Sequence, residues 1–405
     1  IPRHPSITMR AVTRHLSEFT DGEVDLNDFA RGDGFLFVRD GVGCAGRGVA
    51  GRIKSGDATE FLASIERDST DDAPGTGAVL MGCIPFDSAC RHEFVLPKVI
   101  IGKGQQGQKW LTVIDDALPD FTIPETPATT SASYTVEPGI AVPHYLAAVA
   151  AARDAVKSGR LTKAVIARDV LVTSSIPIDV HAVLLRLRAS FGSSYRYSID
   201  GMIGASPELL VAVCGSEISS HPLAGTAPRT GDPDTDRRLA LSLLQSEKNQ
   251  IEHRVVIDMV HDTLLPWCSY LDWEPEPSIV AVANVQHLGT HMNGRLSQPT
   301  PSVLDLVYAL SPTPALGGHP RTEALQLITA VEGIDRGRYG GAVGWVDARG
   351  NGTWAVTIRC AELSADRTSA RLFAGGGIVA DSEPLAELAE TQAKFQAMLA
   401  ALIRP

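Results

Sequence analysis

The chain lacks the features of a membrane protein and of a nucleic-acid-binding protein. None of its apolar runs approaches the ~18–20 residues of a membrane-spanning helix. Basic residues are also few, since 36 Lys and Arg stand against 47 Asp and Glu, and the formal net charge is −11. Nucleic acid and anionic membranes are therefore not expected as partners, although a small anionic ligand remains compatible with a few buried cations. The start, Ile1–His4, has neither an apolar signal core nor an initiator Met, which predicts a trimmed N-terminus and a cytoplasmic location.

Cysteine is sparse. The six cysteines form no CxxC pair, and none lies close to a histidine at zinc-ligand spacing. This distribution excludes a disulfide framework and predicts free thiols in a reducing compartment.

The first third of the chain reads as β-rich. Strands are expected at 34–40 and on both sides of the glycine-rich turn at 103–108. A GxGxxG match at Gly41, Gly43 and Gly46 is followed by two more glycines where a dinucleotide-binding helix should begin, so a β-hairpin is favoured. A Pro-, Thr- and Ser-rich stretch at 124–139 indicates a surface connection.

Helices and strands follow without regular alternation. Helical spacing from Tyr145 to Val156 ends at Gly159, and longer helices are expected at 236–265 and 384–402. Strands are expected at 162–172, 343–346 and 354–358. This order favours a mixed α+β architecture over a parallel doubly wound sheet.

Lysine is scarce, with eight against 28 arginines, and one of the eight lies inside an apolar strand. Lys163 could occupy a solvated strand face. It could equally be a general base, because an ammonium removed from water and close to other cations gives up its proton more readily. Glu208 stands where the next apolar strand begins; a buried carboxyl could donate a proton there, but the residue pattern alone favours an exposed side chain.

Carboxylates gather on one face of each of two expected helices. Asn249 and Glu252 are three positions apart, and Glu387, Glu390 and Lys394 follow at i, i+3 and i+7. Such faces are usually solvated and salt-bridged. The alternative is a Mg²⁺ site with one carboxylate from each helix.

Two glycine-rich stretches and an arginine suggest anion binding. The segment 223–229 and the run Gly375–Gly377 could present backbone amides to an anion, although tight turns explain most such glycines. Arg359 lies in an apolar strand, where it would need an anionic partner such as a carboxylate.

Ten motifs in order make the chain similar to the chorismate-utilising enzymes, which include isochorismate synthases, salicylate synthases and the large chains of anthranilate and aminodeoxychorismate synthases. They span about residues 140–400 and read TKAVIAR (162–168), SPELL (206–210), PLAGT (222–226), SEKNQIEH (246–253), VQHL (285–288), SPTPALGG (311–318), YGGAVGW (339–345), AVTIRCAEL (355–363), GGGI (375–378) and PLAELAETQAK (384–394). The first 130 residues match weakly apart from GCIPFD at 82–87.

The resemblance implies one large α+β domain over 1–405, with two stacked, mostly antiparallel sheets flanked by helices. Residues 1–125 would be a divergent N-terminal part of this fold, and 140–403 the chorismate-binding catalytic part. It also implies chorismate as substrate and Mg²⁺ as cofactor, with no partner chain, so a monomer is expected.

The resemblance further assigns roles to residues of this sequence. Lys163 would deprotonate a water that attacks C2, and Glu208 would protonate the departing C4 hydroxyl. The metal residues would be Glu252 and Glu390, with Glu387 and Asn249 beside them. The substrate-binding residues would be Gly225, Thr226, His287, Tyr339, Ile358, Arg359, Gly375, Gly377 and Lys394.

Several positions discriminate within the family. Ammonia-using members lack the lysine at 163, and aminodeoxychorismate synthases carry a nucleophilic lysine where Ala224 stands. Ile358 before the arginine resembles isochorismate synthases, whereas salicylate synthases tend to have Leu. Ser311, in place of the usual His, and Asn249, in place of an acidic residue, depart from the pattern.

The sequence thus predicts an isochorismate synthase. The alternatives are a salicylate synthase, which also eliminates pyruvate, and a non-catalytic chorismate binder. The product could serve siderophore, menaquinone or salicylate synthesis.

Overall fold

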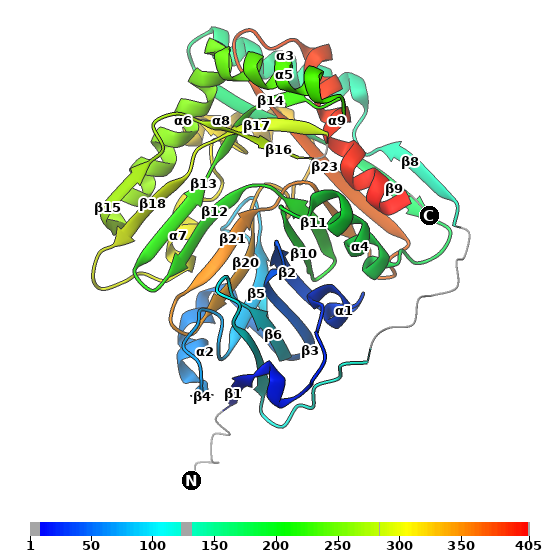
Figure 1. Ribbon diagram of the computed structural model, residues 1–405. Coiled ribbons are helices and arrows are strands. Elements are labelled where there is room, and N and C mark those ends of the chain that lie inside the picture. The colour runs from blue at the N-terminus through cyan, green and yellow to red at the C-terminus, as the bar shows by residue number, and fades with distance from the viewer. Residues whose placement is uncertain (1–8, 123–131, 283, 404–405) are drawn as a thin grey trace, which may run out of the picture.

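The fold was analysed in a computed structural model that describes residues 9–122, 132–282 and 284–403 (Figure 1). Most strands join one large hydrogen-bonded network. Its first branch, in spatial order, is β4 (Glu66–Ser69), β1 (Arg10–His15), β7 (Lys109–Ile114), β6 (Glu93–Lys103), β3 (Val42–Lys54), β2 (Phe35–Arg39), β10 (Tyr195–Ile199), β11 (Met202–Ser206), β22 (Cys360–Leu363), β23 (Ser369–Ile378), β9 (Lys163–Ser174) and β8 (Tyr134–Pro138).

A second branch leaves the network at β6. In spatial order it is β5 (Val79–Ile84), β20 (Ala342–Asp347), β21 (Gly352–Val356), β12 (Leu209–Cys214), β13 (Glu217–His221), β18 (Met292–Leu296) and β15 (Cys268–Trp273). The two-residue strand β19 (Gly318–His319) adds to the edge of β9. A separate small sheet holds β14 (Leu223–Pro228), β17 (Val285–Gly289) and β16 (Ser278–Ala281).

Among the strand pairs of the described residues, β1 and β4 alone run parallel. The predicted α+β class with mostly antiparallel sheets is therefore confirmed, and a parallel doubly wound sheet is excluded. Strands from the first third of the chain pair directly with later ones, as β2 does with β10 and β5 with β20.

Helices cover the outer faces of the sheets. They are α1 (Leu26–Ala30), α2 (Ala58–Ser64), α3 (Val142–Lys157), α4 (Val180–Phe191), α5 (Pro233–Gln245), α6 (Glu247–Leu264), α7 (Val303–Leu310), α8 (Arg321–Val331) and α9 (Pro384–Ile403). The three helices α3, α8 and α9 pack on β9 and β23, while α5 and α6 pack on β14 (Figure 1). No helix of the described residues combines the length and the apolar character needed to cross a bilayer.

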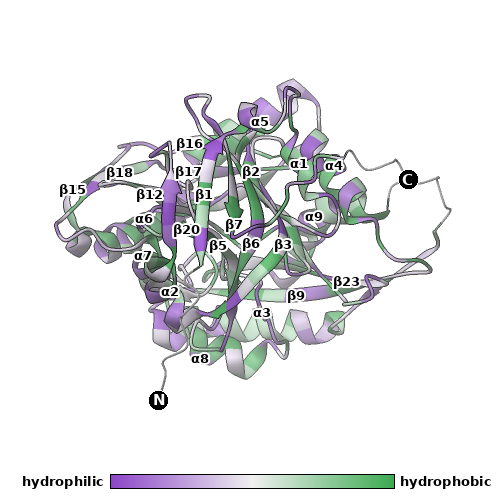
Figure 2. Ribbon diagram, turned by 90° about the horizontal axis from the view of Figure 1, so that it is seen from below, coloured by the Kyte–Doolittle hydropathy of each residue, from purple (hydrophilic) through white to green (hydrophobic). Residues whose placement is uncertain are grey.

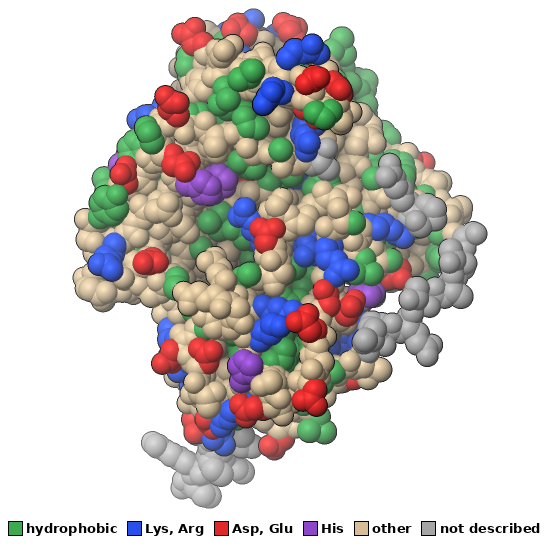
Figure 3. All heavy atoms as spheres, in the orientation of Figure 1, with side chains coloured by type: hydrophobic (Ala, Val, Ile, Leu, Met, Phe, Trp, Pro, Cys, Tyr) green, Lys and Arg blue, Asp and Glu red, His purple; other side chains and the backbone are tan. Residues whose placement is uncertain are grey.

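Apolar side chains concentrate between these layers. In Figure 2 the strands at the centre of the molecule are largely hydrophobic, whereas the helices show both hydrophobic and hydrophilic faces. Trp354, Tyr197, Phe37 and Phe94 are among the largest fully buried side chains. On the face shown in Figure 3, acidic and basic side chains are interspersed rather than gathered into one basic surface.

The strand predictions for the first third are confirmed. The GxGxxG match lies in the antiparallel hairpin β2–β3, with Gly41 in the turn at φ +78°, so a dinucleotide-binding loop is excluded there. The glycine-rich turn at 103–108 joins β6 to β7. All six cysteines are free, as expected.

Two predictions need correction. The single helix expected at 236–265 is two helices, because Ser246 leaves the helical conformation and its hydroxyl caps the N-terminus of α6 by accepting the N–H of Asn249 at 3.3 Å. The surface connection expected at 124–139 falls partly outside the described residues, and its end is not a loop but strand β8, which pairs with β9. The helices expected near 145–157 and 384–402 are confirmed as α3 and α9.

Candidate active site

A cavity of about 230 Å³ lies where β9 and β23, the small sheet and helices α6 and α9 meet. All fifteen site residues expected from the sequence line it: Lys163, Glu208, Gly225, Thr226, Asn249, Glu252, His287, Tyr339, Ile358, Arg359, Gly375, Gly377, Glu387, Glu390 and Lys394. They come from segments up to 231 positions apart, from Lys163 to Lys394, so only the fold brings them together.

Lys163 is the first residue of β9 and is buried, with 3% of its side chain exposed. Its Nζ donates to Oε1 of Glu252 at 2.7 Å. The alternative of a lysine on a solvated strand face is therefore wrong. A buried ammonium needs such a partner, because an unpaired charge in the interior costs several kcal/mol.

Glu208 directly precedes β12, as expected, but the prediction from residue pattern that it is exposed is wrong. Only 3% of it is exposed, and Leu223 of β14 donates its backbone N–H to Oε1 at 3.4 Å. Burial raises the pKa of Glu208 to about 7, against the opposing effects of the Leu223 N–H and of the Lys163 and Arg359 cations. A carboxyl of this kind can hold a proton near neutral pH.

Helices α6 and α9 supply the remaining acidic side chains. Glu387 is 7% exposed, so a fully solvated face on α9 is excluded, and burial together with repulsion from Glu390 raises its pKa to about 7. Ser382 donates to Oε1 of Glu387 at 2.8 Å. Burial would raise the pKa of Glu390 too, but Lys394, which donates to its Oε1 at 2.5 Å, brings the pKa below its usual value.

The side-chain oxygens of the cavity are of the kind that bind a hard divalent cation. Glu252, Glu387, Glu390 and Asn249 offer carboxylate and amide oxygens to one cavity, and Mg²⁺ takes such ligands while keeping several waters. Two of these carboxylates are ion-paired with lysines, and within the described residues no three His, Cys, Asp or Glu side chains are clustered as a ready-made metal site. The residues therefore fit a cation held by few protein ligands and completed by substrate and water.

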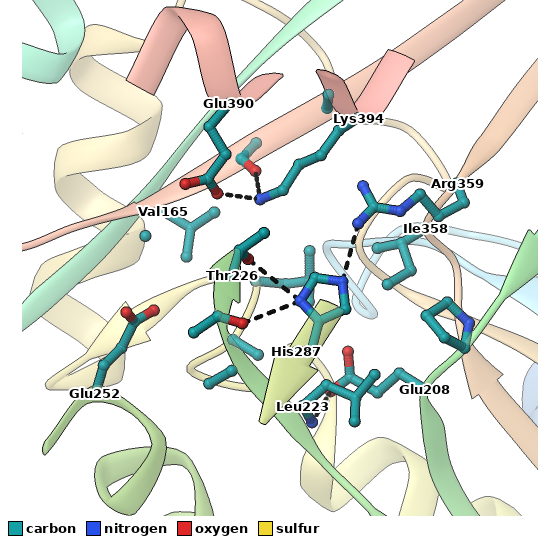
Figure 4. Close-up of a pocket in the computed structure, with 18 of the residues that line it drawn as sticks. Val165, Glu208, Leu223, Thr226, Glu252, His287, Ile358, Arg359, Glu390 and Lys394 are labelled. Carbon is teal, nitrogen blue, oxygen red and sulfur yellow. Dashed lines mark hydrogen bonds and ion pairs between the residues drawn. The ribbon is translucent and has the colours of Figure 1, made fainter. Parts of the chain in front are cut away.

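A neutral histidine orients the arginine. His287 lies between Glu252 and Glu390 on one side of the cavity and Arg359 on the other (Figure 4). Because a carbonyl only accepts, Nδ1 of His287 donates to the oxygen of Gly225 at 3.0 Å, which leaves Nε2 to accept from Arg359 Nη2 at 3.1 Å. Burial, followed by the charges of Arg359 and Lys394, lowers the pKa of His287 to about 3, so the ring stays neutral.

The glycine run 375–377 lies within strand β23 opposite β9, rather than in a tight turn. Lys394 reaches over it and donates to the carbonyl of Gly375 at 2.7 Å. Tyr339 is fully buried against Phe373, with ring centroids 5.1 Å apart and planes 9° apart. That the amides of Gly375 and Gly377 bind an anion stays a prediction.

Sequence reasoning missed part of the cavity wall. Lys248, an exposed side chain on α6, lines the cavity as well. Of the four lysines beyond residue 140, three therefore line one cavity, and their scarcity was the signal that could have identified Lys248. The rest of the wall is apolar or small and consists of Val165, Pro207, Leu223, Ala224, Ala315, Leu316, Phe373 and Ala374.

Gly377 gives the site a sharp test. A Cβ built there would lie 2.6 Å from Cε of Lys163 and 2.7 Å from Oε1 of Glu252, so Gly377→Ala must push this pair apart. We expect turnover to fall about 100-fold, because a displacement of ~1 Å can cost that much, while the melting temperature changes little. Gly56→Ala, where a Cβ meets nothing within 4 Å, is the matched control. Full activity of the Gly377 variant would show that the contact between Lys163 and Glu252 is not needed for catalysis.

Comparisons with known proteins identify a family and several relatives that cover most of the chain. A family model described as chorismate binding enzyme matches residues 91–403. The isochorismate synthase DhbC of Bacillus subtilis is 36% identical over 335 residues, 80% of this chain and 80% of that protein. The isochorismate synthase EntC of Escherichia coli K12 is 36% identical over 337 residues, 79% of this chain and 80% of that protein. The crystal structure of DhbC from Bacillus anthracis superposes with a TM-score of 0.79 at 32% identity, covering 93% of this chain and 98% of that one.

Proposed function

Because the chain belongs to the chorismate-binding enzyme family, we propose that it is an isochorismate synthase, which converts chorismate to isochorismate by adding water at C2 and releasing the C4 hydroxyl. The observation that carries the proposal is one cavity holding a buried lysine, Lys163, and a buried carboxyl, Glu208, whose pKa is near 7. One group can take a proton while the other gives one.

Lys163 and Glu208 would each carry out one of the two proton transfers. Lys163 is paired with Glu252 as an ammonium, so it acts as base only in its neutral form, whose amine accepts a proton from a water as the water oxygen bonds to C2. The ring double bonds shift as the C4–O bond breaks, and Glu208 gives its proton to the leaving hydroxide, which departs as water. One water is consumed and one released, so the reaction is an isomerisation. The lysine at 163 favours water over ammonia as nucleophile, and Ala224 provides no amine for a covalent route.

The cations and the small sheet would hold the substrate. Arg359, fixed by His287, can bind a carboxylate with two parallel N–H groups, and Lys394 and Tyr339 can hold the enolpyruvyl side chain. The amides of Gly375 and Gly377 would assist them. Gly225 and Thr226 would line the ring.

The proposal includes Mg²⁺, which Glu252 and Glu390 would hold with Glu387 and Asn249 beside them. When bound, it would neutralise these carboxylates and grip the ring carboxylate of chorismate. Glu252 is ion-paired with Lys163 and Glu390 with Lys394, so a bound cation would compete with these two lysines for the carboxylates.

The proposal places the enzyme in the cytoplasm as a monomer that acts on free chorismate without a membrane or nucleic acid. Its six free cysteines support a reducing compartment. The isochorismate would feed siderophore, menaquinone or salicylate synthesis.

The direct test is incubation of the purified protein with chorismate and Mg²⁺. We expect chorismate to decline and isochorismate to appear, and chelation by EDTA to stop the reaction. Tight chorismate binding without loss of substrate would identify a non-catalytic binder instead.

The proposed role of Glu208 as the acid predicts how kcat/KM depends on pH. Only protonated Glu208 can donate, so at saturating Mg²⁺ kcat/KM should fall as the pH rises through about 7. Glu208→Gln should leave a residual rate about 10²–10⁴-fold lower, without this falling limb. Glu217→Gln, an exposed carboxyl on β13, serves as the control. A falling limb that persists in the Glu208 variant would assign the acid to another group.

A further inference from the structure

The outer edge of strand β9 is completed by side chains rather than by a strand. At its start, β19 pairs with Lys163 and Ala164, and at its far end β8 pairs with residues 170–174. Between the two, the carbonyl of Val165 and the N–H of Ala167 point to this edge of the strand. The edge is buried inside the protein there. Each must find a hydrogen-bond partner, because a buried backbone group left without one costs about 1–3 kcal/mol.

One ion pair satisfies both groups. Arg336 Nη2 donates to the carbonyl of Val165 at 2.7 Å, and Oε2 of Glu332, the residue that follows α8, accepts the N–H of Ala167 at 2.8 Å. The two side chains hold each other through Nε to Oε1 at 2.7 Å and Nη2 to Oε2 at 2.5 Å. With 3% and 1% of the two side chains exposed, the pair is shielded from solvent.

The same guanidinium also holds the segment next to β9, in which the carbonyl of Gly317 accepts the N–H of Val165 at 3.0 Å. Arg336 Nη1 donates to the carbonyl of Leu316 at 2.7 Å, and Arg336 Cζ lies over the Phe86 ring, 4.3 Å from its centroid. Val165 and Leu316 both line the active-site cavity, whereas neither Arg336 nor Glu332 does. A planar group whose N–H directions are fixed therefore holds two neighbouring cavity segments from behind.

We infer that the Glu332–Arg336 pair is a positioning element that holds β9 so that Lys163 meets the reacting water. Lys163 and Val165 are two residues apart on one strand and both face the cavity. A displacement of the backbone at Val165 therefore also displaces the lysine. This inference rests on the proposed function. Glu332 and Arg336 would not contact the substrate themselves but would position Lys163, the proposed base.

The first experiment separates positioning from stability. Arg336→Met alone leaves a buried carboxylate uncompensated and should lower the melting temperature strongly. The double variant Glu332→Gln/Arg336→Met removes both charges and keeps an acceptor for Ala167, so its melting temperature should recover part of that loss. Its kcat should nevertheless stay about 10–100-fold below wild type with little change in KM, because the Val165 and Leu316 carbonyls have lost their donor. A kcat within about twofold of wild type in the stable double variant would overturn the inference.

The second experiment asks whether the effect passes through the lysine. Arg336→Lys keeps the charge and should fold, but one ammonium cannot reproduce the fork of contacts, so kcat should fall. In a Lys163→Ala background the same substitution should lower kcat by less than about a further twofold. Two substitutions that act through the same side chain do not have additive effects. Independent, multiplicative losses would overturn the inference. Arg14→Met is the control: its guanidinium holds Asp68 at two 3.0 Å contacts on β1, away from the cavity, and should leave kcat unchanged.

Failure of this inference differs from failure of the proposed function. A wild-type protein that does not convert chorismate would refute the function itself. An active wild type whose double variant keeps full kcat would refute the positioning role alone.

Discussion

Lys163→Ala is expected to convert chorismate about 10²–10⁴-fold more slowly than the wild type, the contribution that a positioned general base makes. The substitution removes the amine that contacts Glu252 and lines the same cavity as Glu208. Because β9 is held by β23 through main-chain pairing, the variant should keep its fold, which circular dichroism can verify. Initial rates with chorismate and Mg²⁺ give the comparison.

The matched control is Lys157→Ala, which removes an exposed lysine at the end of α3. It should leave the rate unchanged. If Lys163→Ala kept a near-normal rate, the water would have to be activated by a different group, and the assignment of Lys163 as base would be wrong.

Glu252→Gln and Glu390→Gln should each reduce turnover to the background rate. Each removes one anionic ligand from a cation that we propose keeps few protein ligands, so Mg²⁺ should bind much more weakly. Calorimetric titration of the variants with Mg²⁺ measures that loss without depending on activity. The rate at increasing Mg²⁺ concentrations measures its effect on catalysis.

Glu247→Gln provides the comparison, because this exposed carboxylate stands at the start of the same helix α6 and does not line the cavity. Its Mg²⁺ dependence should equal that of the wild type. Unchanged Mg²⁺ affinity in Glu252→Gln or in Glu390→Gln would remove that residue from the metal site.

Local sequence signals predicted most elements but not where a long helical pattern breaks. The spacing of apolar residues is helical through the whole stretch 236–265. Ser246 nevertheless caps a new helix, because its hydroxyl satisfies the Asn249 N–H that would otherwise lack a partner at the first turn. The break matters for the site, since Asn249 and Glu252 then lie in the first two turns of α6 and face the cavity.

The burial of the reacting groups could not be predicted from local pattern. Glu208 reads as an exposed residue at a strand end, but the fold buries it, and this burial raises its pKa although the N–H of Leu223 opposes the rise. Lys163 reads equally well as solvated or buried, and the outcome depends on Glu252, which lies 89 positions further along the chain. The ordered motifs identified both residues because they describe the whole site rather than one strand.

The supporting contacts behind the cavity escaped prediction for a related reason. Glu332 and Arg336 look like an ordinary i, i+4 ion pair at a helix end. Their importance arises from the gap between β19 and β8 on the edge of β9, which only the three-dimensional arrangement reveals.

The central claim is tested most directly by the identity of the product formed from chorismate at neutral pH with Mg²⁺, followed by proton NMR. The account predicts that isochorismate accumulates to a plateau with chorismate and that little or no salicylate forms, as Ile358 beside Arg359 favours. Pyruvate and salicylate appearing in equal amounts, without an isochorismate plateau, would contradict it and identify a salicylate synthase.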